Sequence, residues 1–362
     1  MQVHLVGGFL GSGKSTAIAM ACKALAERKI TAGVVTNDLG RYLVDTAFFD
    51  AQKIPAVQVT GGCLCSQYDD LLIKLDRLKR AVQPEVIFIE TVGCSADLVA
   101  AVIKPLLEVR GPHDGNITFS VFADTRLLSL WASGESVPFS NKVMYLYGRQ
   151  MEEAGLIVLN KRDLVSPGRA RQALEDARSR FPAKQIALQN SLDPLQIDIW
   201  LDELDALSRR STPLNSLQLE YNHYAEGRSA LGWLDVNLDF TSQSISNHRP
   251  MVIDWITALE REFRQRNIGL GHLKMMVKAG KTDARVSLTT GDAAGWRAQV
   301  PDLRCREMHA LVNIRAEADP TLLRELVQQT AQSAAGRAES QVEEKETEVF
   351  RPDYPKPKRR VP

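Results

Sequence analysis

The chain is poor in cysteine and carries no strong net charge of either sign. Its five cysteines, an odd number with uneven spacing, do not form the framework of a disulfide-stabilised secreted domain. A formal net charge of +1 gives no whole-chain attraction to nucleic acid or to an anionic membrane. No apolar run approaches the roughly 20 residues of a membrane span, and MQVHLVGGFLG lacks the basic residues of a signal peptide. We expect a cytoplasmic protein without nucleic-acid or membrane partners, whose close cysteines serve metal or redox chemistry.

The length of 362 residues exceeds one typical domain core, so two domains are expected. Short apolar runs alternate with helical patterns over the first 165 residues, which is typical of an α/β domain with a mostly parallel sheet. We expect strands at VHLVGGF, TAGVVTN, PAVQVT, EVIFIET, ITFSVFAD and GLIVLNK. An amphipathic helix, QIDIWLDELDALSRR, closes this domain, which we place at residues 1–210.

The second half of the chain has a different pattern. Strands are expected at ALGWLDVNLDF, LGHLKMMVKAG, ARVSLTT and MHALVNIRA, and helices at MVIDWITALEREFRQRN and PTLLRELVQQTAQSA. The order β-α-β-β-β-α predicts a smaller α+β domain of ferredoxin-like type over residues 217–335. From 336 to 362 the chain has few large apolar residues, mixed charge and clustered prolines, so we expect a disordered tail.

The stretch GGFLGSGKST has the full pattern of a phosphate-binding loop between a strand and a helix. Its glycines let backbone N–H groups approach phosphates, and the helix N-terminus adds partial positive charge. Lys14 neutralises phosphate charge, and the hydroxyl of Ser15 can bind Mg²⁺. The residues expected to bind the nucleotide here are Gly8, Gly11, Ser12, Gly13, Lys14, Ser15 and Thr16.

The stretch GLIVLNKRDL ends an apolar strand with three residues suited to a guanine base. Asp163 can accept hydrogen bonds from the N1–H and 2-amino groups of guanine, donors that adenine lacks there. Asn160 can bond the purine, and Lys161 can lie along its plane. The alternative is an ordinary surface helix start with Asp163 as its cap. Because these residues follow a phosphate loop and a buried strand, GTP is the predicted nucleotide.

Two acidic residues follow other predicted strands. Glu90, at the end of EVIFIE, can hold a water bound to Mg²⁺. Asp38, in VVTNDLG, is placed for a switch loop that senses the γ-phosphate, or else is a plain turn residue. With Ser15 they form the predicted Mg²⁺ site, and Lys14, Asp38 and Glu90 are the catalytic candidates. No acceptor-substrate site or lid is apparent, which favours a hydrolase over a kinase.

The stretch VTGGCLCSQYDDL sets Cys63 and Cys65 one residue apart behind two glycines. Both thiolates can converge on one ion, and thiolates favour Zn²⁺, Cu⁺ and related metals. The alternative is that two small residues pack a tight turn. Two thiolates are too few for a closed tetrahedral site. We hypothesise that Cys94, behind IETVG, is the third ligand, because parallel strand ends face one crevice; a small buried residue is the alternative.

These motifs together resemble the CobW/HypB/UreG family of metallochaperone GTPases, most closely its CobW-like branch. The resemblance covers roughly residues 1–205 through GGFLGSGKST, GGCLC, IETVG and NKRD, and more loosely the C-terminal domain. That branch carries a Cys-x-Cys-Cys motif, whereas this chain has Ser66 at the third position. VTNDLG is more similar to the UreG and HypB branch, so the metal site is a variant.

The resemblance implies a Mg²⁺-dependent GTPase that binds a transition metal, Zn, Co or Ni, and delivers metal or a metallocofactor to a client protein. It also implies a homodimer across the nucleotide face. One alternative is a regulatory GTPase that gates the loading of an organic cofactor such as a corrinoid, with structural cysteines. A metal buffer or sensor, in which nucleotide only sets affinity, and an ATP-using enzyme are further alternatives.

Overall fold

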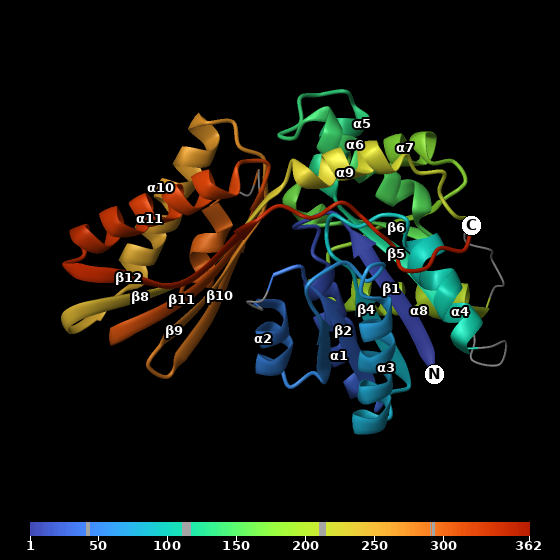
Figure 1. The fold of residues 1–362 in the computed structure, drawn as a ribbon, viewed down its shortest axis with the longest axis horizontal. Helices are drawn as coiled ribbons and strands as arrows, with labels where there is room; N and C mark the ends of the chain where they lie inside the picture. Colours follow the sequence, from blue (N-terminus) through green and yellow to red (C-terminus); the bar gives the residue numbers. More distant parts are fainter. Residues whose placement is uncertain (41–43, 111–116, 210–214, 290, 292–293) are drawn as a thin grey trace. The chain divides into compact units, whose positions relative to one another are not determined.

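The structure is a computed structural model that describes residues 1–40, 44–110, 117–209, 215–289, 291 and 294–362. The chain divides into two compact units (Figure 1). The first unit comprises residues 1–137, 144–225 and 354–362, and the second comprises residues 138–143 and 226–353. In the described part of the chain, no helix is long and apolar enough to cross a membrane.

The first unit is built on a seven-stranded sheet in the order β3-β2-β4-β1-β5-β6-β7, and all its pairs are parallel. The strands are β1 (Gln2–Gly8), β2 (Ala32–Asn37), β3 (Ala56–Val59), β4 (Val86–Glu90), β5 (Ile117–Asp124), β6 (Leu156–Asn160) and β7 (Gln185–Leu188). Strands β2, β4, β5 and β6 are buried at every position, so both faces of the sheet are covered. The α/β prediction is confirmed. The prediction missed β7 because its four residues are too few for a clear pattern.

Helices follow most of these strands. They are α1 (Lys14–Glu27), α2 (Val44–Ala51), α3 (Tyr68–Val82), α4 (Lys104–Arg110), α5 (Thr125–Ala132), α6 (Asn141–Glu153), α7 (Pro167–Arg180), α8 (Pro194–Arg209) and α9 (Tyr221–Ser229), with the short π-helix η1 (Val99–Ile103) and the 3-10 helix η2 (Arg162–Leu164). Trp200 of α8 packs between the rings of Phe88 and Phe122, with centroids 5.9 and 5.2 Å away. This aromatic cluster fixes α8 on the sheet beside α1.

The sheet order places every predicted motif at one edge. Parallel strands have their carboxyl ends on the same side, and ligands bind outside those ends. Along this edge the order is the cysteine loop after β3, Asp38 after β2, Glu90 at the end of β4, the phosphate loop after β1 and Asn160 at the end of β6. The topology therefore gathers segments that are far apart in the sequence.

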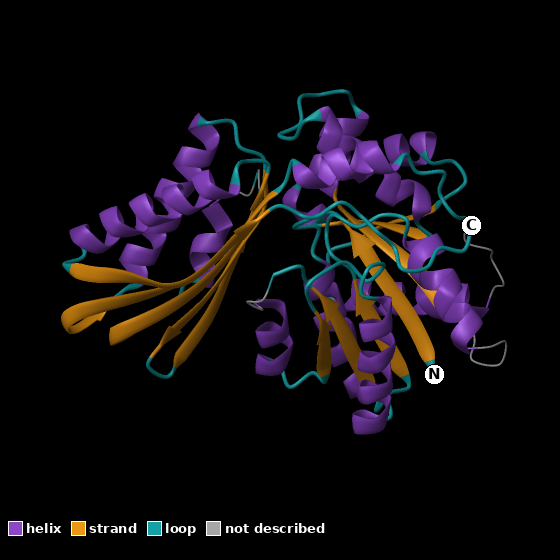
Figure 2. Ribbon diagram, in the orientation of Figure 1, coloured by secondary structure: helices purple, strands orange, loops and turns teal. Residues whose placement is uncertain are grey.

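The second unit is an antiparallel sheet with helices on one face (Figure 2). Its strand order is β10-β9-β11-β8-β12. The elements are β8 (Gly232–Asn247), α10 (Arg249–Gln265), β9 (Leu270–Ala279), β10 (Thr282–Leu288), η3 (Ala294–Gln299), β11 (Arg304–Ala316), α11 (Pro320–Arg337) and β12 (Ser340–Phe350). Without β10, the β-α-β-β-α-β order and the sheet order β9-β11-β8-β12 are ferredoxin-like, as predicted.

The expected disordered tail, residues 336–362, is not what the structure shows. α11 continues to Arg337, and Ser340–Phe350 form the edge strand β12, paired antiparallel with β8. An edge strand can carry many charges because one side of it faces solvent. Glu344 binds Arg324 of α11 at 2.6 Å, and Phe350 packs on Trp233 of β8. Residues 354–362 belong to the first unit.

Candidate nucleotide and metal site

The phosphate loop runs from the end of β1 to the start of α1. Gly8 has φ +123°, and a Cβ there would lie 2.1 Å from the carbonyl oxygen of Phe122. Gly13 has φ +93°, and its Cβ would lie 2.4 Å from Nδ2 of Asn160. Both positions therefore require glycine. The loop backbone turns tightly before α1 begins at Lys14, which is the geometry that presents backbone N–H groups to phosphate.

Lys14 and Ser15 begin α1 and are both buried. Nζ of Lys14 donates to the carbonyl oxygens of Gly8 and Phe9 at 2.9 and 3.1 Å, so it lies across the loop. Oγ of Ser15 donates to Oε1 of Glu90 at 2.9 Å. A hydroxyl and a carboxylate held this close are oxygen donors of the kind that Mg²⁺ prefers, so these two residues fit the ion.

Asp38 follows β2 and is half-buried. Its Oδ1 accepts a hydrogen bond from the N–H of Gly40 at 3.2 Å, and its own N–H donates to Val59 at 3.3 Å. Asp38 therefore stabilises the turn after β2, which is the alternative role that the sequence suggested for it. The position at the end of β2, next to β4 and Glu90 in the sheet, also suits the predicted switch role.

Asn160 links the phosphate loop to the segment that follows β7. Its Nδ2 donates to the carbonyl oxygen of Ser12 at 2.8 Å. Its Oδ1 accepts from the N–H and the Oγ of Ser191, at 3.1 and 2.8 Å. Asn160 is buried, and these contacts give it a positioning role. Sequence reasoning missed Ser191, which lies three residues after β7, itself a missed strand.

Lys161 and Asp163 stand at the end of β6. Lys161 adopts a left-handed backbone conformation, φ 62°, and its Nζ lies 3.1 Å from Oδ2 of Asp124. Burial alone raises the pKa of Asp124, but Lys161 and Arg126 together hold this pKa below its ordinary value. Asp163 is exposed. It does not cap the following helix, because Ser166 caps α7 by accepting from the N–H of Arg169.

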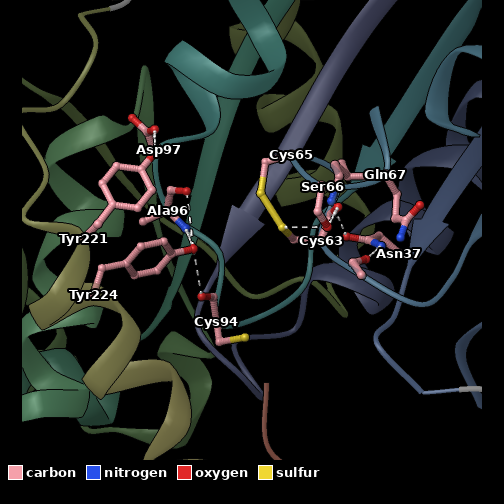
Figure 3. The surroundings of a disulfide bond; sticks show 12 residues. Asn37, Cys63, Cys65, Ser66, Gln67, Cys94, Ala96, Asp97, Tyr221 and Tyr224 are labelled. Carbon is pink, nitrogen blue, oxygen red and sulfur yellow. Dashed lines mark hydrogen bonds between the residues drawn. A yellow bond between two sulfur atoms is a disulfide. The ribbon is translucent and has the colours of Figure 1, made fainter. Parts of the chain in front are cut away.

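The cysteine loop lies between β3 and α3 and is held by Asn37 (Figure 3). Nδ2 of Asn37 donates to the carbonyl oxygen of Gly62 at 2.8 Å, and its Oδ1 accepts from the N–H of Leu64 at 3.2 Å. Cys63 and Cys65 are buried and joined by a disulfide. The expected pair of free thiolates is thus a disulfide in this structure, and the metal site on these two residues stays a prediction. Sequence reasoning missed Asn37, the last residue of β2, because its partners lie 25 and 27 residues away.

Cys94 follows β4 and is a completely buried thiol. Its carbonyl oxygen accepts from the hydroxyl of Tyr224 at 3.4 Å, and Gln150 donates to the carbonyls on both sides, at Gly93 and Ser95. Figure 3 shows it apart from the disulfide. Within the described residues, no group of three or more His, Cys, Asp or Glu side chains could hold a metal ion. The hypothesised Cys63/Cys65/Cys94 cluster is therefore not assembled in the described part of the chain.

Comparisons with known proteins agree with the motifs. The family model described as "CobW/HypB/UreG, nucleotide-binding domain" matches residues 2–188, more than half of the chain. The chain is 26% identical over 205 residues to the zinc chaperone CobW of a Sinorhizobium species, which covers 51% of this chain and 57% of that protein. It thus spans little more than half the length of this curated relative.

Two solved structures are similar to part of this chain. One is the hydrogenase maturation factor HypB from Archaeoglobus fulgidus, at 17% identity and a TM-score of 0.39, covering 58% of this chain and 91% of that chain. The other is HypB from Helicobacter pylori in complex with nickel, at 18% and 0.40, covering 59% and 92%. The chain belongs to the CobW/HypB/UreG family, and its first unit contains that family's nucleotide-binding domain.

Proposed function

We propose that the protein is a Mg²⁺-dependent metallochaperone GTPase. It binds and hydrolyses GTP, carries Zn, Co or Ni on the reduced thiols of Cys63 and Cys65, and passes the metal or a metallocofactor to a client protein. The family assignment supports the nucleotide part of this proposal, and the similarity to a zinc chaperone supports the metal part.

One observation carries the link between the two activities. Asn37, which holds the cysteine loop through Gly62 and Leu64, is the direct chain neighbour of Asp38. Asp38 is, in this proposal, the residue that senses the γ-phosphate. A change of backbone at Asp38 on hydrolysis therefore moves Asn37 and, through its side chain, the loop that carries both sulfurs.

The nucleotide site divides the chemical roles among its residues. Backbone N–H groups of the loop from Gly8 to Gly13 bind the phosphates, and Lys14 exchanges its loop carbonyls for phosphate oxygens. Ser15 and Glu90 would hold Mg²⁺, which neutralises developing charge on the phosphates. Asp38 or Glu90 orients the attacking water. Asp163, exposed beside the phosphate loop's anchor Asn160, selects guanine.

The metal is cargo, and its binding begins with reduction of the disulfide. A dithiol reductant supplies two electrons and two protons and becomes a disulfide itself, which leaves the thiols of Cys63 and Cys65. Loss of their protons gives the thiolates that bind Zn²⁺ or a related ion. Two sulfurs leave coordination positions open, which suits transfer to ligands of the client.

Metal titration of the reduced protein tests the proposal. Co²⁺, Zn²⁺ and Ni²⁺ are titrated with GDP and with a non-hydrolysable GTP analogue, because thiolate ligation gives Co²⁺ visible charge-transfer bands. Wild type is compared with the Cys63→Ser/Cys65→Ser variant and, as the matched control, with Cys305→Ser in the second unit.

We expect tight binding that depends on Cys63 and Cys65 and changes with the nucleotide. Asn37→Ala should keep metal binding and lose its nucleotide dependence. No metal binding in either nucleotide state would favour the corrinoid-loading alternative.

Base selection needs its own experiment. Asp163→Asn replaces an acceptor with an amide whose NH₂ donates, so the variant should lose GTP affinity and gain affinity for xanthosine triphosphate, which has a 2-carbonyl group. Competition against a fluorescent GTP analogue measures both. Equal affinity of the wild type for ATP and GTP would contradict the guanine assignment. Light scattering with each nucleotide tests the homodimer that the resemblance implies.

A further inference from the structure

The last residues of the chain are seated on the first unit as an extended peptide. The N–H of Lys358 donates to the carbonyl oxygen of Cys65 at 2.9 Å, and the N–H of Val361 donates to Ala100 at 2.8 Å. At the end, Nζ of Lys104 donates to the carbonyl oxygen of Pro362 at 2.6 Å. Prolines at 355, 357 and 362 restrict the free segment to extended conformations, which lowers the entropy lost on docking.

Arg360 is the side chain that this site recognises. Its Nε and Nη2 lie 2.9 and 3.3 Å from the two carboxylate oxygens of Asp97, a bidentate pair, and Nη2 also donates to the carbonyl oxygen of Leu217 at 2.9 Å. The Asp97 side chain is only 2% exposed, and it accepts a further hydrogen bond from the hydroxyl of Tyr221. A buried carboxylate is stable only when a cation balances its charge. The two oxygens of Asp97 match the parallel N–H donors of a planar guanidinium.

The backbone at Asp97 has an uncommon conformation. Its φ of 64° lies in the left-handed region, which aspartate and asparagine adopt more readily than other non-glycine residues. The hydroxyl of Tyr224 meanwhile accepts from the N–H of Ala96 at 2.9 Å and fixes the preceding residue. Asp97 is thus held in place to receive its cation.

The neighbouring charges contribute little affinity but set the direction of the segment. Lys358 binds Asp69 at 2.5 Å, and Arg359 pairs with Glu108. These side chains are 47 to 69% exposed, so both pairs are solvated and weak. Arg359 and Arg360 therefore form a natural comparison: the same residue type at adjacent positions, one on an exposed carboxylate and one on a buried one.

We propose that this surface is an arginine-specific peptide site, formed by Asp97, Tyr221 and the carbonyls of Cys65, Ala100 and Leu217. The C-terminal segment is its resident ligand. A basic, extended segment of a partner protein competes for the same site. When it docks, the hydrogen bond from the N–H of Lys358 to the carbonyl oxygen of Cys65, in the cysteine loop, is lost and the partner's backbone takes its place. The proposal goes beyond the GTPase and metal activities and does not depend on either.

Peptide binding to the full chain tests the proposal without nucleotide or metal. In the Arg360→Glu variant, a carboxylate faces Asp97, so the tail leaves the site. A fluorescent peptide with the sequence of residues 354–362 should bind this variant. It should bind the wild type at least about tenfold more weakly, because the wild-type tail competes at high effective concentration. In the double variant Arg360→Glu/Asp97→Asn, peptide binding should be abolished. Asparagine adopts the left-handed backbone conformation, so this substitution removes the charge without disturbing the backbone.

Variant peptides supply the matched control. Arg360→Gln in the peptide should weaken binding on the order of tenfold or more, whereas Arg359→Gln should change it by less than about threefold. Hydrogen exchange at the amides of Lys358 and Val361 reports release of the tail in each protein. The proposal is overturned if the tail is released and the peptide does not bind, or if Arg359 matters as much as Arg360. It is also overturned if Arg360→Glu leaves both amides protected.

Discussion

Glu153 is a buried carboxyl group whose ionisation should control how the stability of the first unit depends on pH. It ends α6, its side chain is buried, and its Oε1 accepts a hydrogen bond from the N–H of Val99 at 2.6 Å. Burial raises the pKa of Glu153 from 4.5 to about 7, although the hydrogen bond from Val99 opposes the rise.

The sign of the effect follows from proton binding. Between about pH 4.5 and 7 the folded state keeps the proton of Glu153 and the unfolded chain has lost it. Stability therefore falls as pH rises through this window. At about 1.4 kcal/mol per pKa unit, the loss above pH 7 is about 3 kcal/mol. His4 acts in the opposite direction, because burial lowers its pKa from 6.5 to about 4, so stability rises with pH between those values. In the wild type the two effects largely cancel.

The Glu153→Gln variant separates them. Glutamine keeps an acceptor for Val99 and does not titrate, so the variant minus wild-type stability should grow by about 3 kcal/mol from pH 4.5 to 7.5. Hydrogen exchange of β1 and β4 peptides as a function of urea measures the first unit alone. The exposed neighbour Glu152 supplies the matched control, Glu152→Gln. A Glu153→Gln difference that is flat within about 1 kcal/mol over this range would refute the reasoning.

Two further substitutions test other parts of the structure. Gly13→Ala would force a side chain onto a backbone with φ +93° and place its Cβ 2.4 Å from Nδ2 of Asn160, so GTP affinity should fall at least about tenfold, measured by titration calorimetry. A normal GTP affinity would contradict the loop geometry. In the second unit, Asp235→Ala removes the buried carboxylate that Arg315 and Asn313 bind, at 2.5 and 2.6 Å. That unit should lose about 3–5 kcal/mol in urea unfolding, and a loss below about 1 kcal/mol would show that the ion pair is not a determinant of stability.

Two contacts restrain the cysteine loop. Asn37 joins the loop to the end of β2, and Lys358 joins it to the C-terminal segment. The loop therefore has two independent restraints, one beside the predicted switch residue and one on a displaceable peptide. Under the proposed function and the proposed peptide site, nucleotide and partner binding would each act on the loop through a different contact.

The phosphate-loop backbone and the alternation of strands and helices were predictable from the sequence. Each depends on residues that are close along the chain. Gly8 and Gly13 need φ values that other residues avoid, and a strand buried on both faces must be continuously apolar. Local patterns of this kind also identified the ferredoxin-like second domain, apart from its last strand.

The tertiary structure decided what depended on partners distant in sequence. The sequence of β12 resembles a charged, disordered tail. It forms a strand because the free edge of β8 supplies its hydrogen-bonding partners, and its own sequence does not reveal that partner. Cys94 appeared available as a ligand, yet its thiol is completely buried, and Gln150 and Tyr224 bind the backbone of its loop. Arg360 meets Asp97 across 263 residues. Periodicity and composition describe the neighbourhood of a residue along the chain, whereas these contacts are set by where the folded sheet brings its loops together.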